Sequence, residues 1–186
     1  VWWYTKRHTN VYLVVDTSGS MQGEKLANVR VALTTFLGSI KGDQERVGLI
    51  DFSHRIKQLI LVEELGRNRR ELESAIAALE AEGDTALLDA IATAYVRLQA
   101  AQDPERINAI VAMTDGLENA STIGLDELVE SIRTGNQERL PVVIFCIAYG
   151  SDADFETLQL IAEASGGQAR SGDVTTIEEL YKILST

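Results

Sequence analysis

Runs of consecutive apolar residues alternate along the chain with segments in which apolar residues recur every three or four positions. The runs predict buried strands, and the recurring positions predict helices that cover them. We expect strands over residues 10–15, 46–52, 56–64, 107–113, 141–148 and, shorter, 168–170. We expect helices over residues 22–41, 68–81, 85–101, 125–133, 154–164 and 177–184, the first of them closed by Gly42.

The order of these elements predicts how the sheet is built. Only Ser53–Arg55 separates the second strand from the third, which permits a hairpin but no parallel crossover. The third strand should therefore run antiparallel to the second. A helix separates the other strands, so the fold class is α/β: a doubly wound, mainly parallel six-stranded sheet with helices on both faces.

Charge and hydropathy exclude two classes of partner. The chain has 28 acidic and 17 basic residues, and its net charge of −11 opposes binding to nucleic acid or to an anionic membrane surface. The longest tight apolar run, Val142–Ala148, is far shorter than the roughly 20 residues of a membrane span. We expect no nucleic-acid partner and no direct membrane insertion by this domain, whereas cation binding stays open.

The length of 186 residues suits one well-filled core. We expect residues 1–9 to form an N-terminal linker or flank and residues 10–186 to form one domain. Because the chain begins with Val1 and not with methionine, we expect a domain taken from a longer protein.

The segment Val11–Met21 carries the first candidate chemistry. Its apolar run ends on Asp16, Ser18 and Ser20, so these side chains lie on the loop that leaves a strand, where Gly19 allows a tight bend. One carboxylate and two hydroxyls form an oxygen-only pocket, which suits Mg²⁺, Mn²⁺ or Ca²⁺ better than zinc or copper. The alternative is an ordinary helix cap, for which these residue types are common.

Two distant segments offer further oxygen atoms. Asp115 ends the fourth strand, and Thr85 opens a helix that leads back into that strand. If the first and fourth strands are neighbours, Asp16 and Asp115 face one crevice at the carboxyl edge of the sheet. Taken singly, Asp115-Gly116 could be a plain turn, and Thr85 or Asp84 could simply cap a helix.

Three motifs together carry a resemblance to a known family: Asp16-Thr17-Ser18-Gly19-Ser20, Gly83-Asp84-Thr85-Ala86-Leu87 and Met113-Thr114-Asp115-Gly116. They resemble the three parts of the metal-ion-dependent adhesion site of von Willebrand factor A domains. The resemblance covers essentially the whole chain, and the Ser-Gly-Ser-Met form is similar to bacterial members.

The resemblance implies a site and a topology. Ser18 and Ser20 would bind the metal directly, and Asp16, Thr85 and Asp115 would bind it directly or through water. The implied strand order is 3-2-1-4-5-6 with strand 3 antiparallel. It also implies a protein-binding module for adhesion or assembly, in which Mg²⁺ or Mn²⁺ bridges to an Asp or Glu carboxylate of a protein partner. An extracellular or cell-surface location, as part of a larger bacterial protein, would fit this function.

Two alternatives belong to other functional classes. The metal could merely fix three loops of a structural module. An aspartate-nucleophile phosphatase of the haloacid dehalogenase type would also place an aspartate after the first strand. It would need a second aspartate two residues later as acid and base, where this chain has Ser18. We therefore expect a domain that is not an enzyme.

Overall fold

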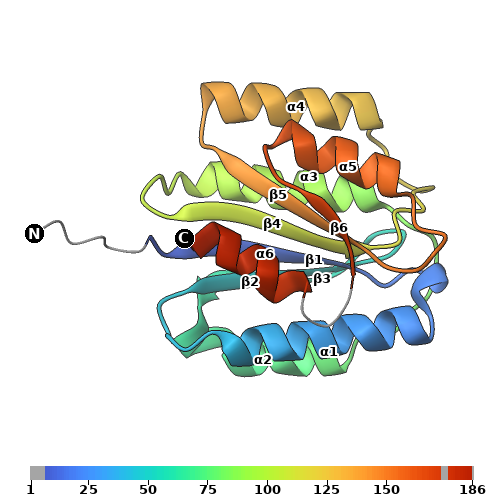
Figure 1. Ribbon diagram of the computed structural model, residues 1–186, viewed down its shortest axis with the longest axis horizontal. Helices are drawn as coiled ribbons and strands as arrows, with labels where there is room; N and C mark the ends of the chain where they lie inside the picture. The colour runs from blue at the N-terminus through green and yellow to red at the C-terminus, as the bar shows by residue number, and fades with distance from the viewer. Residues whose placement is uncertain (1–6, 173–175, 186) are drawn as a thin grey trace, which may run out of the picture.

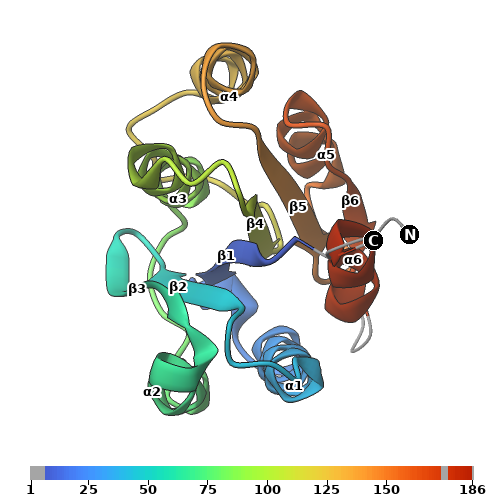
Figure 2. The ribbon, with the colours of Figure 1, turned by 90° about the vertical axis from the view of Figure 1, so that its left-hand side faces the viewer.

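A computed structural model of the protein describes residues 7–172 and 176–185, so residues 1–6 of the predicted flank lie outside it. A sheet of six strands lies between two layers of helices (Figures 1 and 2). The strands are β1 (Thr9–Asp16), β2 (Arg46–Phe52), β3 (Ile56–Glu64), β4 (Ile107–Thr114), β5 (Val142–Ala148) and β6 (Ala169–Ser171). The helices are η1 (Gly19–Met21), α1 (Glu24–Ser39), α2 (Leu65–Ala77), α3 (Leu87–Ala101), α4 (Leu125–Glu138), α5 (Phe155–Ala164) and α6 (Thr176–Ser185).

The strand order is β3-β2-β1-β4-β5-β6, which confirms the predicted topology. β3 runs antiparallel to β2, and the other neighbours are parallel. β1 therefore lies inside the sheet between β2 and β4, with both edges paired. Because helices cover both faces of the sheet, every residue of β1 is buried, which explains its unbroken apolar run.

The two faces of the sheet build separate cores. Val11, Leu13 and Val15 point from β1 toward α1, α2 and α6. Tyr12 and Val14 point the other way, toward α3, α4 and α5. Figure 2 shows these helices as layers on opposite sides of the strands. Each fully buried aliphatic side chain contributes about 1.5–3 kcal/mol, so β1 holds both layers together.

Several predicted helix limits are wrong. The second helix spans Leu65–Ala77 and not residues 68–81, and the third begins at Leu87 and not at residue 85. The first helix begins at Glu24 because residues 19–21 form the separate helix η1. It ends at Ser39, whose hydroxyl donates to the Phe36 carbonyl, so Gly42 is not its cap. The fourth helix continues beyond residue 133 to Glu138.

None of the helices in residues 7–172 and 176–185 has the length and apolar character that crossing a membrane requires.

Candidate metal centre

The ends of β1 and β4 place two aspartates at one edge of the sheet, at the right in Figure 1. Asp16 is the last residue of β1, and Asp115 directly follows β4. The Thr114 hydroxyl donates to Asp16 Oδ2 over 2.6 Å, which ties the two strand ends together. Both carboxylates have an exposed fraction of 0%. Two negative groups are thus held out of water in one place.

The loop after β1 adds two hydroxyls. The backbone N–H of Ser18 donates to Asp16 Oδ1 over 2.8 Å, and this bond folds the loop back over the strand end. Ser18 Oγ and Ser20 Oγ are 3.1 Å apart, so the two hydroxyls face each other. Ser18 is buried and Ser20 is exposed. The pair therefore leads from the buried carboxylate toward solvent.

The loop before α3 is joined to the loop after β1 by backbone hydrogen bonds. Gly19 N–H donates to the Gly83 carbonyl over 2.8 Å, and Glu82 N–H donates to the Thr17 carbonyl over 2.9 Å. Thr85 follows in this loop and is buried, with an exposed fraction of 3%. Three remote segments that the sequence singled out are thus brought to one edge of the sheet.

The loop after β4 fixes the position of Thr85. Asn119, in the loop after β4, accepts a hydrogen bond from the Thr85 N–H through its Oδ1 over 2.8 Å. The N–H groups of Asn119 and Ala120 both donate to the Thr85 carbonyl over 3.0 Å. The backbone of Thr85 is fully occupied by these contacts, so its position is set by the loop after Asp115.

The donor set fits a hard divalent cation. In the described residues, no group of three or more His, Cys, Asp or Glu side chains could hold a metal ion. A metal at this edge would therefore depend on the hydroxyls of Ser18, Ser20 and Thr85 beside the two carboxylates. Such an all-oxygen set with few charges suits Mg²⁺ or Mn²⁺, which keep water ligands.

Burial raises the pKa of Asp16 above its ordinary value, and the nearby charge of Asp115 acts in the same direction. Hydrogen bonds from Ser18 and Thr114 act against the rise in pKa. The carboxylate is thus oriented by two donors yet carries a desolvated charge. A cation beside the carboxylate would offset that charge, so the electrostatics of these residues fit a bound metal ion.

Sequence reasoning missed a cation at the site. Lys25, in the first turn of α1, places its Nζ 3.3 Å from Asp115 Oδ2 and 2.8 Å from Asp152 Oδ1. Gly150 has a φ of +90°, and a Cβ at this position would collide with the Lys25 side chain. A lysine in the first turn of a helix opposes the helix dipole. That mismatch was the available signal for an acidic partner nearby.

Other supporting residues carried weaker signals. Thr17 Oγ1 donates to Asp51 Oδ1 over 2.5 Å, and the Thr17 N–H donates to the Phe52 carbonyl over 2.8 Å. These bonds anchor the loop after β1 to β2. The roles of Thr17, Thr114 and Asn119 depend on which strands are neighbours, so sequence spacing alone could not assign them.

Comparisons with known proteins agree with this fold. The model of the von Willebrand factor type A domain matches residues 10–185. Inter-alpha-trypsin inhibitor heavy chain H4 of Sus scrofa is 29% identical over 183 residues, which are 93% of this chain and 20% of that protein. The chain thus spans about a fifth of the length of the curated relatives it matches.

Solved structures share the architecture. A von Willebrand factor type A protein from Catenulispora acidiphila superposes with a TM-score of 0.74 at 23% identity, over 96% of this chain and 42% of the other. Manganese-loaded TRAP protein of Plasmodium vivax gives 0.71 at 19% identity, over 97% and 74%. The pilus adhesin SpaC of Lactobacillus rhamnosus GG gives 0.74 at 16% identity, over 96% and 30%.

At these identities the solved structures establish a common fold and no more. The sequence model covers nearly the whole chain, and the sheet order matches the one that the three motifs implied. The chain belongs to the von Willebrand factor type A domain family.

Proposed function

We propose that this domain binds proteins through a divalent metal, Mg²⁺ or Mn²⁺, to which an Asp or Glu of the partner is attached. Ser18 and Ser20 hold the metal directly, and Asp16, Thr85 and Asp115 hold it directly or through water. The observation that carries the proposal is the hydrogen-bonded meeting of three remote segments around buried Asp16. The manganese-loaded TRAP structure, which has the same fold, supports the choice of metal.

The charges of the site favour an acidic guest. A bound divalent cation supplies a Lewis-acidic point with exchangeable ligands. The three hydroxyl donors are neutral, and the charge of Asp115 is balanced in part by Lys25 at 3.3 Å. Asp16 and the partly balanced Asp115 together supply less negative charge than the two positive charges of the metal, and a carboxylate from outside completes the balance.

The surface around the site suits a protein partner. Ser20 is exposed, and the rim on the Asp115 side carries Leu117 and Phe155, each 37% exposed. Leu117 N–H donates to Asp115 Oδ1, and the residue before Phe155 donates its N–H to the Asp115 carbonyl. We therefore expect the partner's acidic residue to have an apolar neighbour. The pilus adhesin SpaC among the similar structures fits this function and a cell-surface setting.

Metal binding and carboxylate binding can be tested separately. MnCl₂ is titrated into the domain by calorimetry, and the relaxation rate of water protons then reports how many waters the bound Mn²⁺ holds. Glutamate capped at both ends is added next, with capped glutamine as the matched control. We expect the glutamate to displace water from the metal and the glutamine to have no effect.

The outcomes separate the alternatives. An Asp16→Ala variant should lose the calorimetric signal and every effect of glutamate. A wild-type domain that binds no Mn²⁺ would contradict the proposal at its base. Mn²⁺ binding that glutamate leaves unaltered would identify a structural metal that only fixes three loops.

A further inference from the structure

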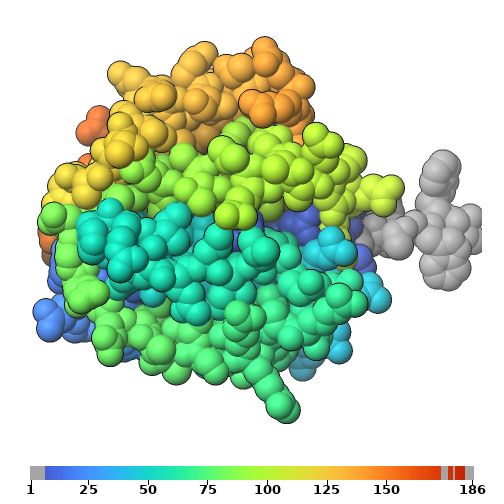
Figure 3. All heavy atoms as spheres, turned by 180° about the vertical axis from the view of Figure 1, so that it is seen from behind, coloured from blue at the N-terminus to red at the C-terminus, as the bar shows by residue number. Residues whose placement is uncertain are grey.

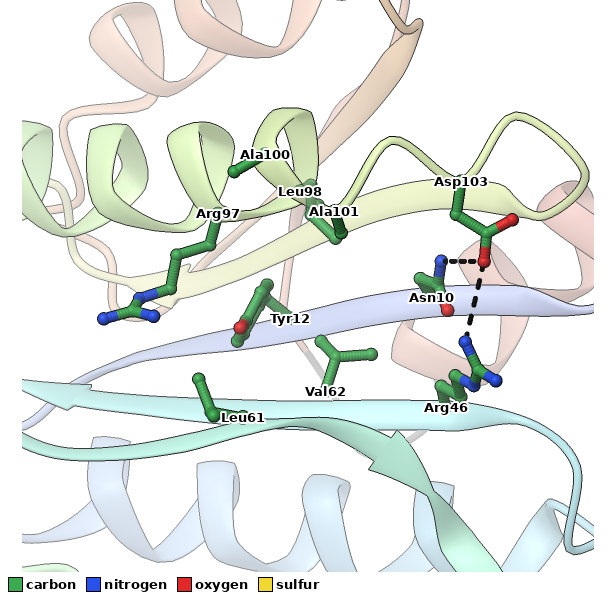
Figure 4. A pocket seen from close by; sticks show the side chains of 10 residues that line it. All are labelled: Asn10, Tyr12, Arg46, Leu61, Val62, Arg97, Leu98, Ala100, Ala101 and Asp103. Atoms are coloured by element: carbon green, nitrogen blue, oxygen red, sulfur yellow. Dashed lines mark hydrogen bonds and ion pairs between the residues drawn. The ribbon is translucent and has the colours of Figure 1, made fainter.

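A second candidate site lies on the face of the molecule that carries β3 and α3. Seen from behind, part of β1 shows at the bottom of a furrow between these two elements (Figure 3). The furrow encloses about 390 Å³ and is lined by side chains from β1, β2, β3 and α3. Its floor contains Tyr12, and its sides carry Leu61 and Arg97 (Figure 4). We call this furrow the β3–α3 groove.

An irregularity in β3 lies in the wall of the groove. On β2, Val47 pairs with Glu63 and Leu49 pairs with Ile60, so two residues of β3 lie opposite Gly48 alone. These two are Leu61 and Val62, and the arrangement is a β-bulge. A Cβ at Gly48 would come within 2.7 Å of both the Ile60 carbonyl and the Tyr12 ring. Glycine thus lets Tyr12 cover this point of the sheet.

The groove exposes apolar surface that the domain does not cover itself. Leu61, which lines the groove, is 56% exposed. Among the described residues only six large apolar side chains are 37% exposed or more, and Leu61 is one of them. A furrow with an apolar wall, the Tyr12 ring in its floor and a few polar groups at its ends is typical of a binding site.

The two ends of the groove carry polar groups with unused hydrogen-bonding capacity. Asn10 is 3% exposed, and its Oδ1 has no hydrogen-bond partner in the described residues, nor has the buried Nε of Arg46. The Asn10 amide nitrogen is occupied by Asp103 and Asn108. One acceptor and one donor are thus buried without a partner at this end of the groove, where Figure 4 shows Asn10 beside Arg46.

The opposite end of the groove carries a cation. Figure 4 shows the Arg97 side chain extending past Tyr12, away from Asn10 and Arg46. Arg46 pairs with Asp103 at 3.6 Å, but no acidic side chain pairs with Arg97 within residues 7–172 and 176–185. In a chain with a net charge of −11, this cation beside apolar surface favours an anionic guest.

We propose that the β3–α3 groove binds an extended acidic peptide segment of a protein partner, independently of the metal centre. An aliphatic side chain of the peptide packs on Tyr12 and Leu61, and its Asp or Glu pairs with Arg97. As the peptide binds, the Asn10 and Arg46 side chains turn toward it, so that a backbone N–H donates to Asn10 Oδ1 and a backbone carbonyl accepts from Arg46 Nε. Asn10 and Tyr12 are two residues apart on β1, about 6.6 Å, which is the repeat of an extended peptide.

A peptide satisfies these groups better than two other guests. A simple aliphatic carboxylate could pair with Arg97 but would offer no donor to Asn10 Oδ1. A strand added to the outer edge of β3 would meet a strand whose register shifts twice, near Gly48 and between Asp51 and Phe52. Such breaks make an edge unsuitable for regular strand pairing.

The test selects from a random peptide library displayed on phage, with the whole domain as bait in the presence of EDTA. EDTA removes metal, so this result stands apart from the test of the metal centre. Selected peptides should combine Asp or Glu with an aliphatic residue. As synthetic peptides, they should bind Leu61→Asp and Arg97→Glu about tenfold or more weakly than the wild type.

Matched variants guard against general effects. Leu160 is 44% exposed on α5, and Arg133 is exposed on α4, so Leu160→Asp and Arg133→Glu should leave binding unchanged. All four positions are on the surface, and circular dichroism checks that each variant folds. The proposal is overturned by no enrichment, by peptides without acidic residues, or by binding that the Leu61 and Arg97 variants retain. Equal binding of hexanoate would also overturn it, because it would indicate a small-carboxylate site.

Discussion

At the scale of single residues, the buried charge of Asp16 lowers the stability of the metal-free domain. Its carboxylate is excluded from water and lies near the second carboxylate, Asp115. Two hydrogen bonds orient it but do not remove the cost of burying a charge, since its pKa still lies above the ordinary value. A costly buried charge of this kind is common where a residue serves binding at the expense of stability.

Replacing Asp16 with Asn should therefore stabilise the metal-free domain, by about 1 kcal/mol at pH 7, while it abolishes metal binding. A raised pKa means that protonation favours the folded state. Protonated Asp16 contributes to the free energy of unfolding. This contribution is fully present below the ordinary pKa of 3.8 and is lost as the pH rises through the raised pKa. The gain from Asp16→Asn should therefore be largest at pH 7 and vanish near pH 4.

Urea denaturation in EDTA at both pH values measures this difference, with Glu73→Gln on α2 as an exposed control. Equal or lower stability of Asp16→Asn at pH 7 would show that burial of the charge is not costly.

Lys25 sets how strongly the site attracts a metal. Its Nζ lies 3.3 Å from Asp115 Oδ2, so it competes with a cation for that carboxylate. Lys25→Met should tighten Mn²⁺ binding about five- to tenfold in calorimetry, because a positive charge is removed beside a ligand. The same variant should bind capped glutamate more weakly. Lys25→Arg keeps the charge and serves as the control; weaker Mn²⁺ binding by Lys25→Met would contradict this role.

At the scale of elements, the bulge of β3 depends on one glycine. Gly48→Ala would place a Cβ 2.7 Å from the Ile60 carbonyl, a backbone atom that cannot move without disturbing the sheet. We expect a loss of about 2–3 kcal/mol in the free energy of unfolding. Gly38→Ala in α1 is the matched control, since nothing lies within 4 Å of its Cβ position. It should stabilise the domain by about 0.5 kcal/mol.

Urea denaturation of both alanine variants tests this prediction. A Gly48→Ala variant as stable as Gly38→Ala would mean that β2 and β3 adjust freely at the bulge.

The strands could be predicted from sequence almost residue by residue, because their apolar runs are continuous and end in polar turns. Helix limits were harder to predict where local bonding decides. Residues 19–21 form η1 and not the start of α1, and the Ser39 hydroxyl ends α1 before Gly42. α4 continues through Gly135, which lies against Tyr95 in the structure. This packing depends on α3 and α4 being neighbours, which no local pattern reveals.

The five candidate ligands could be predicted because each sits at a strand end or helix start within a recognisable motif. Their metal binding remains a prediction, although the structure brings their segments together. Lys25 and Asn119 could not be assigned, because their contacts join segments 90 and 34 residues apart in the chain. The β3–α3 groove likewise arises only from the packing of α3 over the bulge.

At the scale of the whole molecule, Cys146 in the centre of β5 reports on global unfolding. It has an exposed fraction of 0%, and burial raises the pKa of its thiol to about 12. Iodoacetamide should therefore label the native domain only through unfolding, with an extent that follows the urea transition seen by circular dichroism. Mn²⁺ should slow labelling further by stabilising the folded state. Rapid labelling without urea would show that the sheet opens locally.

The most direct test of the metal centre is anomalous diffraction from a crystal of the domain grown with Mn²⁺. We predict one strong peak at the edge of the sheet where β1 and β4 end, about 2.1 Å from the hydroxyl oxygens of Ser18 and Ser20. Asp16, Thr85 and Asp115 should surround it directly or through water. A map without a peak among these five side chains, at a Mn²⁺ concentration that saturates the calorimetric signal, would contradict the account.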